Sequence, residues 1–133
     1  MTLTAPQKQA VALGGGRVLN GLLLLAWPSL PAALYLGPGG RTPTARALGR
    51  FVGARDVITG IGALLAVPRR TGDVEIVGAA ALCEAIDAAI SLGSPGVAWR
   101  MRAAAGTAVL AAGAGFWAAR GLAADRRAPS AAG

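Results

Sequence analysis

Five charged residues lie inside the second and third apolar stretches of the sequence, where they could take part in acid–base chemistry. They are Arg50, Arg55, Asp56, Glu84 and Asp87. A carboxyl group can act as a general acid or base, and an arginine can hold an anionic group. The interiors of these two stretches hold two arginines and three carboxylates, so one carboxylate lacks a counter-charge unless Arg17 of the first stretch reaches it. Asp56, Glu84 and Asp87 are therefore candidate catalytic residues for proton transfer or general acid chemistry.

The basic and amide side chains of the apolar stretches are candidate ligand-binding groups. Arg50 and Arg55 belong to the segment above, and Arg17 and Asn20 lie in the first apolar stretch. Charged groups in such surroundings normally face the interior of a helix bundle and pair with one another. Three roles stay open for them: a network that only orients helices, a pocket for a ligand or substrate, and a proton pathway.

The composition indicates a membrane protein. Hydrophobic residues make up 54% of the 133 residues, charged residues make up 14%, and the mean hydropathy is positive. A soluble domain usually has about 25% charged residues. The apolar content is largely Ala and Gly, and small residues are common where transmembrane helices pack closely. With only two Phe, three Trp and one Tyr, a soluble core would be poorly filled.

Several functions are disfavoured by the sequence. The net charge of +7 comes from basic residues scattered between apolar segments, so we expect no nucleic-acid partner. Histidine is absent from the sequence, which removes the usual metal ligand and general base, and we expect no metal or other cofactor. Cys83 has no histidine to activate it and is interpreted as an inert thiol. The glycine-rich segments 14–16 and 37–40 lack the lysine and Ser/Thr ending of a phosphate-binding loop.

The first apolar stretch runs from Val11 to Leu36 and allows two interpretations. A bilayer core of about 30 Å needs roughly 20 helical residues, which this stretch supplies. Pro28 removes a helical hydrogen bond and favours a span that ends near Trp27, followed by a short interfacial helix over residues 29–37. In the alternative, the same helix continues to the end of the stretch.

The rest of the chain contains three further apolar stretches separated by turns rich in Gly and Pro. The turn between the second and third stretches is short, so these two form an antiparallel hairpin, and Thr44 can cap the second. We predict an all-α fold, a four-helix transmembrane bundle over residues 10–122, with a polar N-terminal tail (1–9) and a disordered C-terminal tail (123–133). The three further spans cover residues 45–67, 73–92 and 97–122.

The hairpin predicts which charges meet. We take the second span to begin near residue 47 and the third to end near residue 92, on the same side of the membrane. The depth of a residue is then counted from these two points at about 1.5 Å per residue. The depths then match in the same order, which pairs Arg50 with Asp87 and Arg55 with Glu84. Arg55 and Asp56 diverge by about 100° around the helix, so they cannot both point at the third span.

Asp56 is predicted to face the first span. Gly53 and Gly60 share its side of the helix, and such a stripe of small residues suits close packing against another helix. The polar partners available on the first span are Arg17 and Asn20. Asp56 is therefore the carboxylate without a partner in the hairpin.

The segment Gly53-x-Arg55-Asp56-x-x-x-Gly60, followed by an acidic third span with Asp87, resembles a family of proteins with a domain of unknown function. These are small four-span integral membrane proteins in which a GxRDxxxG segment opens the second span. The resemblance implies a four-helix membrane fold and an important Arg55–Asp56 pair. It implies no activity, and Glu84 is not part of the pattern.

Four spans place both termini on one side of the membrane. The basic residues predicted on that side are Lys8, Arg69, Arg70, Arg120, Arg126 and Arg127, and those on the other side are Arg41, Arg46, Arg100 and Arg102. The positive-inside rule therefore predicts a multi-pass protein of the cell membrane with both termini in the cytoplasm.

Three functional hypotheses follow. The first is a small integral membrane protein that binds a lipophilic small molecule in a polar intramembrane pocket, alone or as an accessory subunit. The second is a membrane enzyme, such as an isomerase, a cyclase or an epoxide-opening catalyst, that uses the buried carboxylates. The third is a small proton-coupled transporter. The expected partners are membrane lipids, the lipophilic ligand, and a second copy of the chain or another membrane protein.

Overall fold

The computed structural model describes residues 2–96 and 99–128, and these residues form helices joined by short turns. The helices are α1 (Ala5–Ala26), α2 (Ser29–Leu36), the short 3₁₀ helix η1 (Gly37–Arg41), α3 (Pro43–Arg69), α4 (Asp73–Gly93) and α5 (Trp99–Arg127). Four of them, α1, α3, α4 and α5, are long and apolar enough to cross a membrane. The predicted all-α four-helix bundle is confirmed.

The first apolar stretch divides as the proline predicts. Helix α1 ends at Ala26, and α2 begins at Ser29 as a separate helix of eight residues. The start of α1 differs from the prediction, because the helix begins at Ala5 inside the expected tail. Thr4 and Gln7 form a reciprocal capping box there, which satisfies backbone N–H groups at the helix start.

Two other boundaries also differ from the prediction. Helix α3 is capped by Thr42 rather than Thr44, since the Thr42 hydroxyl accepts a hydrogen bond from the N–H of Ala45 at 3.2 Å. Helix α5 continues to Arg127, so the first residues of the expected C-terminal tail are helical. The remainder of that tail, residues 129–133, lies outside the described residues.

Helices α1 and α3 form one closely packed pair, and glycine makes their close approach necessary. A Cβ atom on Gly21 would lie 2.5 Å from the carbonyl oxygen of Gly53, and one on Gly60 would lie 2.6 Å from that of Gly14. Both distances are shorter than side chains tolerate, so larger residues would push the helices apart. The glycine stripe predicted beside Asp56 therefore packs against the first span.

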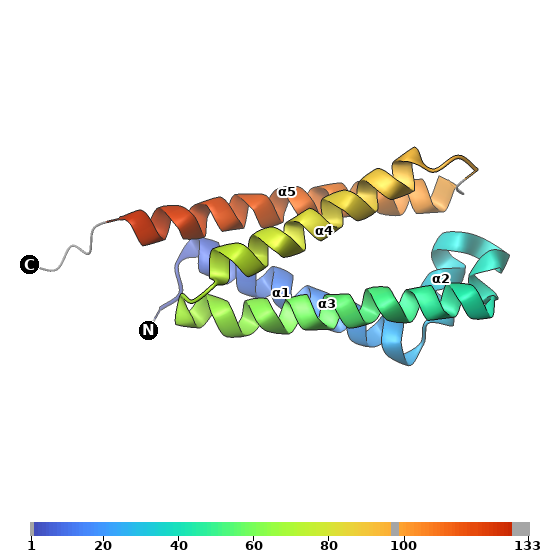
Figure 1. Cartoon of the computed structure of the whole chain (residues 1–133), viewed down its shortest axis with the longest axis horizontal. Coiled ribbons are helices and arrows are strands. Elements are labelled where there is room, and N and C mark those ends of the chain that lie inside the picture. The colour runs from blue at the N-terminus through green and yellow to red at the C-terminus, as the bar shows by residue number, and fades with distance from the viewer. Residues whose placement is uncertain (1, 97–98, 129–133) are drawn as a thin grey trace, which may run out of the picture.

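Helices α4 and α5 form the second pair, also through small residues. A Cβ atom on Gly115 would lie 2.8 Å from that of Ala81. The two pairs lie close together near the chain termini and separate towards the end that carries α2, as Figure 1 shows. The chain termini lie at the same end of the molecule, as four spans require.

The end near the termini is closed by packing and by hydrogen bonds. A buried core joins helices from both pairs there, and its members are Ala10, Ala63, Val67, Val77, Ala118, Ala119 and Leu122. The Gln7 amide donates to the carbonyl of Val67 at 3.3 Å, and the Thr4 hydroxyl donates to Asp125 at 2.7 Å. Arg126 forms an ion pair with the buried carboxylate of Asp73.

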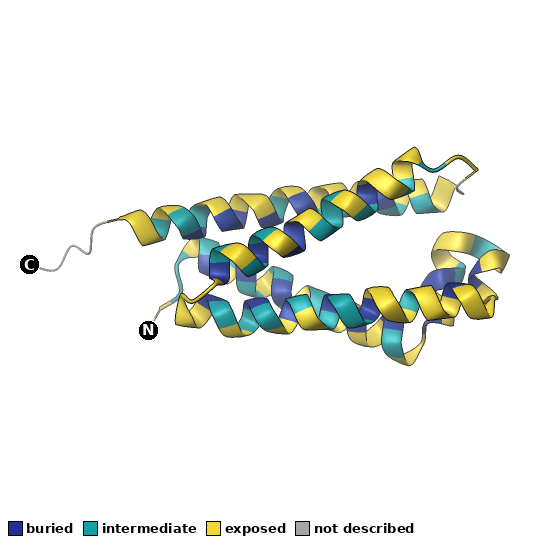
Figure 2. Cartoon of the chain, in the orientation of Figure 1, coloured by how far each residue is buried: buried dark blue, intermediate teal, exposed yellow. Residues whose placement is uncertain are grey.

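The outer surface of the bundle is apolar. Figure 2 shows the buried residues on the inward faces of the helices and exposed residues along their outer faces. The most exposed large side chains include Leu19, Phe51, Ile58 and Leu110, each at least 70% exposed. Large apolar side chains at that exposure fit contact with lipid rather than with water.

Candidate functional site

A cavity of about 830 Å³ lies between the two helix pairs. Gly14, Ala63 and Val77 line its inner part, next to the core of the closed end. Tyr35 of α2 and Met101 of α5 line it at the opposite end of the bundle. The wall is mostly apolar, and its charged residues are Arg17, Arg55, Asp56, Glu84 and Asp87.

The charged residues lie near the middle of their helices. Asp56 is thirteen residues from Pro43 and thirteen from Arg69, the two ends of α3. At about 1.5 Å per residue, this places its backbone about 20 Å from either end. Glu84 likewise lies eleven residues after the start of α4 and nine before its end. The site therefore lies about midway along the helices that are long enough to cross a membrane.

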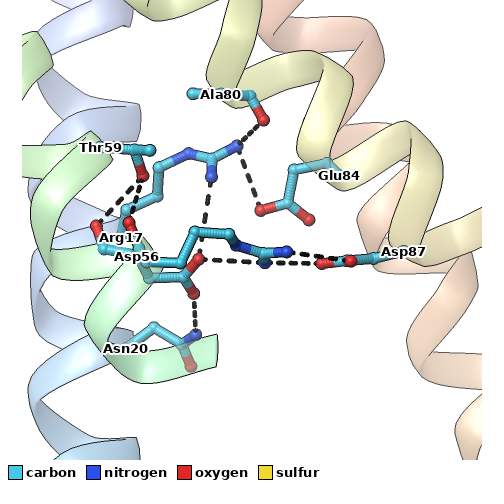
Figure 3. A network of polar contacts seen from close by, with 8 residues as sticks. Arg17, Asn20, Asp56, Thr59, Ala80, Glu84 and Asp87 are labelled. Atoms are coloured by element: carbon cyan, nitrogen blue, oxygen red, sulfur yellow. Dashed lines mark hydrogen bonds and ion pairs between the residues drawn. The ribbon is translucent and has the colours of Figure 1, made fainter. Parts of the chain in front are cut away.

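Asp56 is buried and is held by groups from its own helix and from α1. Asn20 donates a hydrogen bond to its carboxylate at 2.9 Å, and Arg55 contacts it at 3.3 Å. A guanidinium nitrogen of Arg17 lies 4.0 Å away (Figure 3). The prediction that the first span supplies the polar partners of Asp56 is confirmed, and the packing of Gly21 against Gly53 brings the helices close enough for it.

Arg55 pairs with Asp87 and not with Glu84. Two guanidinium nitrogens donate to the two carboxylate oxygens of Asp87 at 3.0 and 2.6 Å, in the bidentate geometry that suits arginine. The predicted pair of Arg55 with Glu84 is wrong because a cation from a third helix, Arg17, already lies against Glu84. The count along the hairpin considered only the second and third spans.

Arg17 joins α1 to α4 across the cavity. Its guanidinium lies 3.1 Å from Glu84 and donates a hydrogen bond to the backbone carbonyl of Ala80 at 2.7 Å (Figure 3). Ala80 and Glu84 are one helical turn apart, so they present their oxygens side by side. Arg17 was predicted as a polar partner for Asp56 and as a ligand-binding residue, and its contact with Glu84 was not predicted. The sequence signal for this contact was the presence of a cation within the first span, since such a cation needs a carboxylate partner on another helix.

Arg50 does not belong to the site. Its side chain is exposed, and it forms no ion pair with any residue that the structure describes. Arg50 precedes Arg55 by five residues, which turns it by about 140° away around the helix. The predicted pair of Arg50 with Asp87 is therefore wrong, and six of the seven predicted site residues line the cavity. Cys83 is only partly buried and does not line the cavity.

Two arginine nitrogens are buried without a hydrogen-bond acceptor among the described residues, namely Nη1 of Arg17 and Nε of Arg55. The hydroxyl of Thr59 lies close by but donates to the backbone carbonyls of Arg55 and Asp56. Within residues 2–96 and 99–128, no group of three side chains is arranged to hold a metal ion. The site is thus a network of ion pairs and hydrogen bonds in a largely apolar cavity.

The fold and the site together define a class: a multi-pass α-helical membrane protein with ionisable residues lining a cavity between its helix pairs. Comparisons of the chain with family models, with curated proteins and with solved structures found no match. The resemblance to four-span proteins with a GxRDxxxG segment stays a prediction.

Proposed function

We propose that this protein binds a lipophilic small molecule in the cavity between its helix pairs, with the polar part of that molecule at the level of Asp56. The observation that carries the proposal is the combination of about 830 Å³ of largely apolar space with charged side chains at mid-depth. Ligand sites in proteins are typically concave and apolar with a few placed polar groups.

Contacts other than the charges also hold the helices together. Glycine packing joins α1 to α3, and the apolar core at the closed end joins the two pairs. A charged residue near the middle of the membrane costs about 3 kcal/mol or more. Replacing buried ion pairs by well-packed apolar groups is often neutral or stabilising, so keeping five such residues around a cavity favours a binding role.

The orientation belongs to the same proposal. Both termini lie in the cytoplasm, because the end that carries them has the larger number of basic residues. The cavity then extends from the closed cytoplasmic end towards the end that carries α2. The ligand enters from that side or from the surrounding lipid.

A matched pair of substitutions on α5 tests the proposal. Ala104 lines the cavity, whereas its neighbour Ala103 is exposed on the outside of the helix and does not. Ala104→Trp should fill part of the cavity and Ala103→Trp should leave it free. Native mass spectrometry of protein purified from its own membrane should detect a bound small molecule in the wild type and in Ala103→Trp, and lose it in Ala104→Trp. Equal occupancy in both variants, or none in the wild type, contradicts the proposal.

A membrane enzyme is the second candidate, favoured by the exposure of one carboxylate to the cavity. The side chain of Asp87 is 36% exposed, against 5% for that of Asp56. Asp87 is thus more accessible to a bound molecule than Asp56 is. If this carboxylate acts on the ligand, the molecule that co-purifies with Asp87→Asn should differ chemically from the one that co-purifies with the wild type. The same molecule in both proteins contradicts this candidate.

A further inference from the structure

We infer that the molecule in the cavity is an amphiphile with one positive charge, such as a protonated or quaternary alkylamine. This inference rests on the proposed function. Of the residues that line the cavity, two are cationic and three are anionic, and all others are neutral. With every group ionised the wall has a charge of −1. A bound monocation makes the site neutral, whereas a bound anion doubles its negative charge.

Both arginines are already engaged by carboxylates. Arg55 uses two nitrogens on Asp87, and Arg17 lies against Glu84. The arginine N–H groups without an acceptor, Nη1 of Arg17 and Nε of Arg55, are buried in the protein and present no surface to the cavity. An anionic headgroup would therefore have to displace an existing ion pair before it could bind.

Glu84 is the carboxylate that is least satisfied. Asp56 accepts hydrogen bonds from Asn20 and Arg55, and Asp87 accepts two from Arg55. Glu84 lies near Arg17 but accepts no hydrogen bond from any described residue, and its side chain is partly exposed in the cavity wall. A carboxylate in apolar surroundings gains most from a cation that comes directly against it. Glu84 is therefore the group that we expect the ligand cation to meet.

The rest of the cavity wall is largely apolar, so we expect the remainder of the same molecule to be apolar. Leu48, Val52 and Ile90 line the cavity on the side of the network that faces α2. Tyr35 lines it too, and the face of an aromatic ring attracts an alkylammonium group as it enters. A simple inorganic cation would leave these side chains uncovered, so the charge and the wall together indicate an amphiphile.

The test compares two probes that differ only in charge, hexyltrimethylammonium and the neutral isostere in which carbon replaces the nitrogen. Calorimetric titration of the protein in lipid nanodiscs, with empty nanodiscs as the blank, gives both affinities. The wild type should bind the cation at least about tenfold more tightly, because a desolvated charge pair contributes more than an exposed one. Equal affinities, or binding of neither probe, overturn the inference.

Substitutions of single carboxylates test which negative charge binds the cation. Glu84→Gln removes the excess negative charge and should reduce the preference for the cation to about threefold or less. Glu75→Gln removes an exposed carboxylate on the same helix, outside the cavity, and should keep the full preference. Asp87→Asn changes the charge of the cavity wall by the same amount as Glu84→Gln, and it replaces that variant in the test if Glu84→Gln fails to fold. Preserved preference in both cavity variants contradicts the inference.

These results separate the inference from the proposed function. If Ala104→Trp removes a co-purified molecule while the two probes bind equally, the cavity is a ligand site for a neutral molecule and only the charge assignment fails. If Ala104→Trp changes no occupancy and neither probe binds, both the inference and the proposed function fail.

Discussion

The end of the bundle near the termini and the middle of the bundle are held together by different contacts. The end near the termini is joined by apolar packing, in which Val67 and Leu122 are almost fully buried, and by side-chain hydrogen bonds at the helix ends. The middle of the bundle contains a cavity, and the two helix pairs are connected there mainly through ion pairs. The closed end can therefore support the fold, while the space between the charged side chains stays open to a ligand.

This comparison predicts the largest loss of stability for Arg17→Gln. The substitution removes the positive charge that lies near the carboxylates of Glu84 and Asp56. Removing one partner of a buried ion pair costs about 3–5 kcal/mol of stability. Arg50→Gln is the control, because Arg50 is exposed and should have no effect. Thermal unfolding in detergent, followed by circular dichroism, measures both. Equal unfolding temperatures for the two variants would show that the ion pairs contribute nothing.

A smaller loss is predicted for Gly60→Ala. The added Cβ would lie 2.6 Å from the carbonyl oxygen of Gly14, so α1 and α3 must separate. Overpacking of this kind costs about 1–3 kcal/mol. Gly15→Ala adds the same methyl group on α1 where no atom lies within 4 Å, and it should be neutral or slightly stabilising. A similar loss in both variants, by the same unfolding assay, would remove the argument for close glycine packing.

The smallest effect is predicted at the closed end. Thr4→Ala removes the cap of α1 and the hydrogen bond to Asp125, at a cost of about 1 kcal/mol. The exposed Thr2 offers a control, since Thr2→Ala should change nothing. Hydrogen exchange at the start of α1 should rise in Thr4→Ala while amides near the cavity stay protected. Increased exchange around Asp56 instead would show that the closed end and the cavity are not independent.

The fold could be predicted from the sequence because the length and polarity of each span depend on local composition. Pro28 likewise marked the end of α1 correctly. The partners of the charged residues could not be predicted in the same way. A count of residues along a hairpin gives depth, but not the angle at which α4 leans away from α3, nor the reach of an arginine side chain from α1.

The errors at Arg50 and Arg55 have separate causes. Arg50 has a suitable depth but points about 140° away from Arg55, so depth alone was misleading. Arg55 faces the right helix but meets Asp87, because Arg17 lies against Glu84. The glycine stripe beside Asp56 succeeded because close packing depends on small residues that are visible in the sequence. Pairings that involve three helices need the arrangement of all three.

A double-mutant cycle between Arg17 and Glu84 tests the account most directly. Unfolding free energies of Arg17→Gln, Glu84→Gln and the double variant give the coupling energy of the pair, and the same cycle for Arg55 and Glu84 is the comparison. We expect a coupling energy of about 1–3 kcal/mol for Arg17 with Glu84 and a clearly smaller one for Arg55 with Glu84. A larger coupling for Arg55 would contradict the arrangement of charges around the cavity.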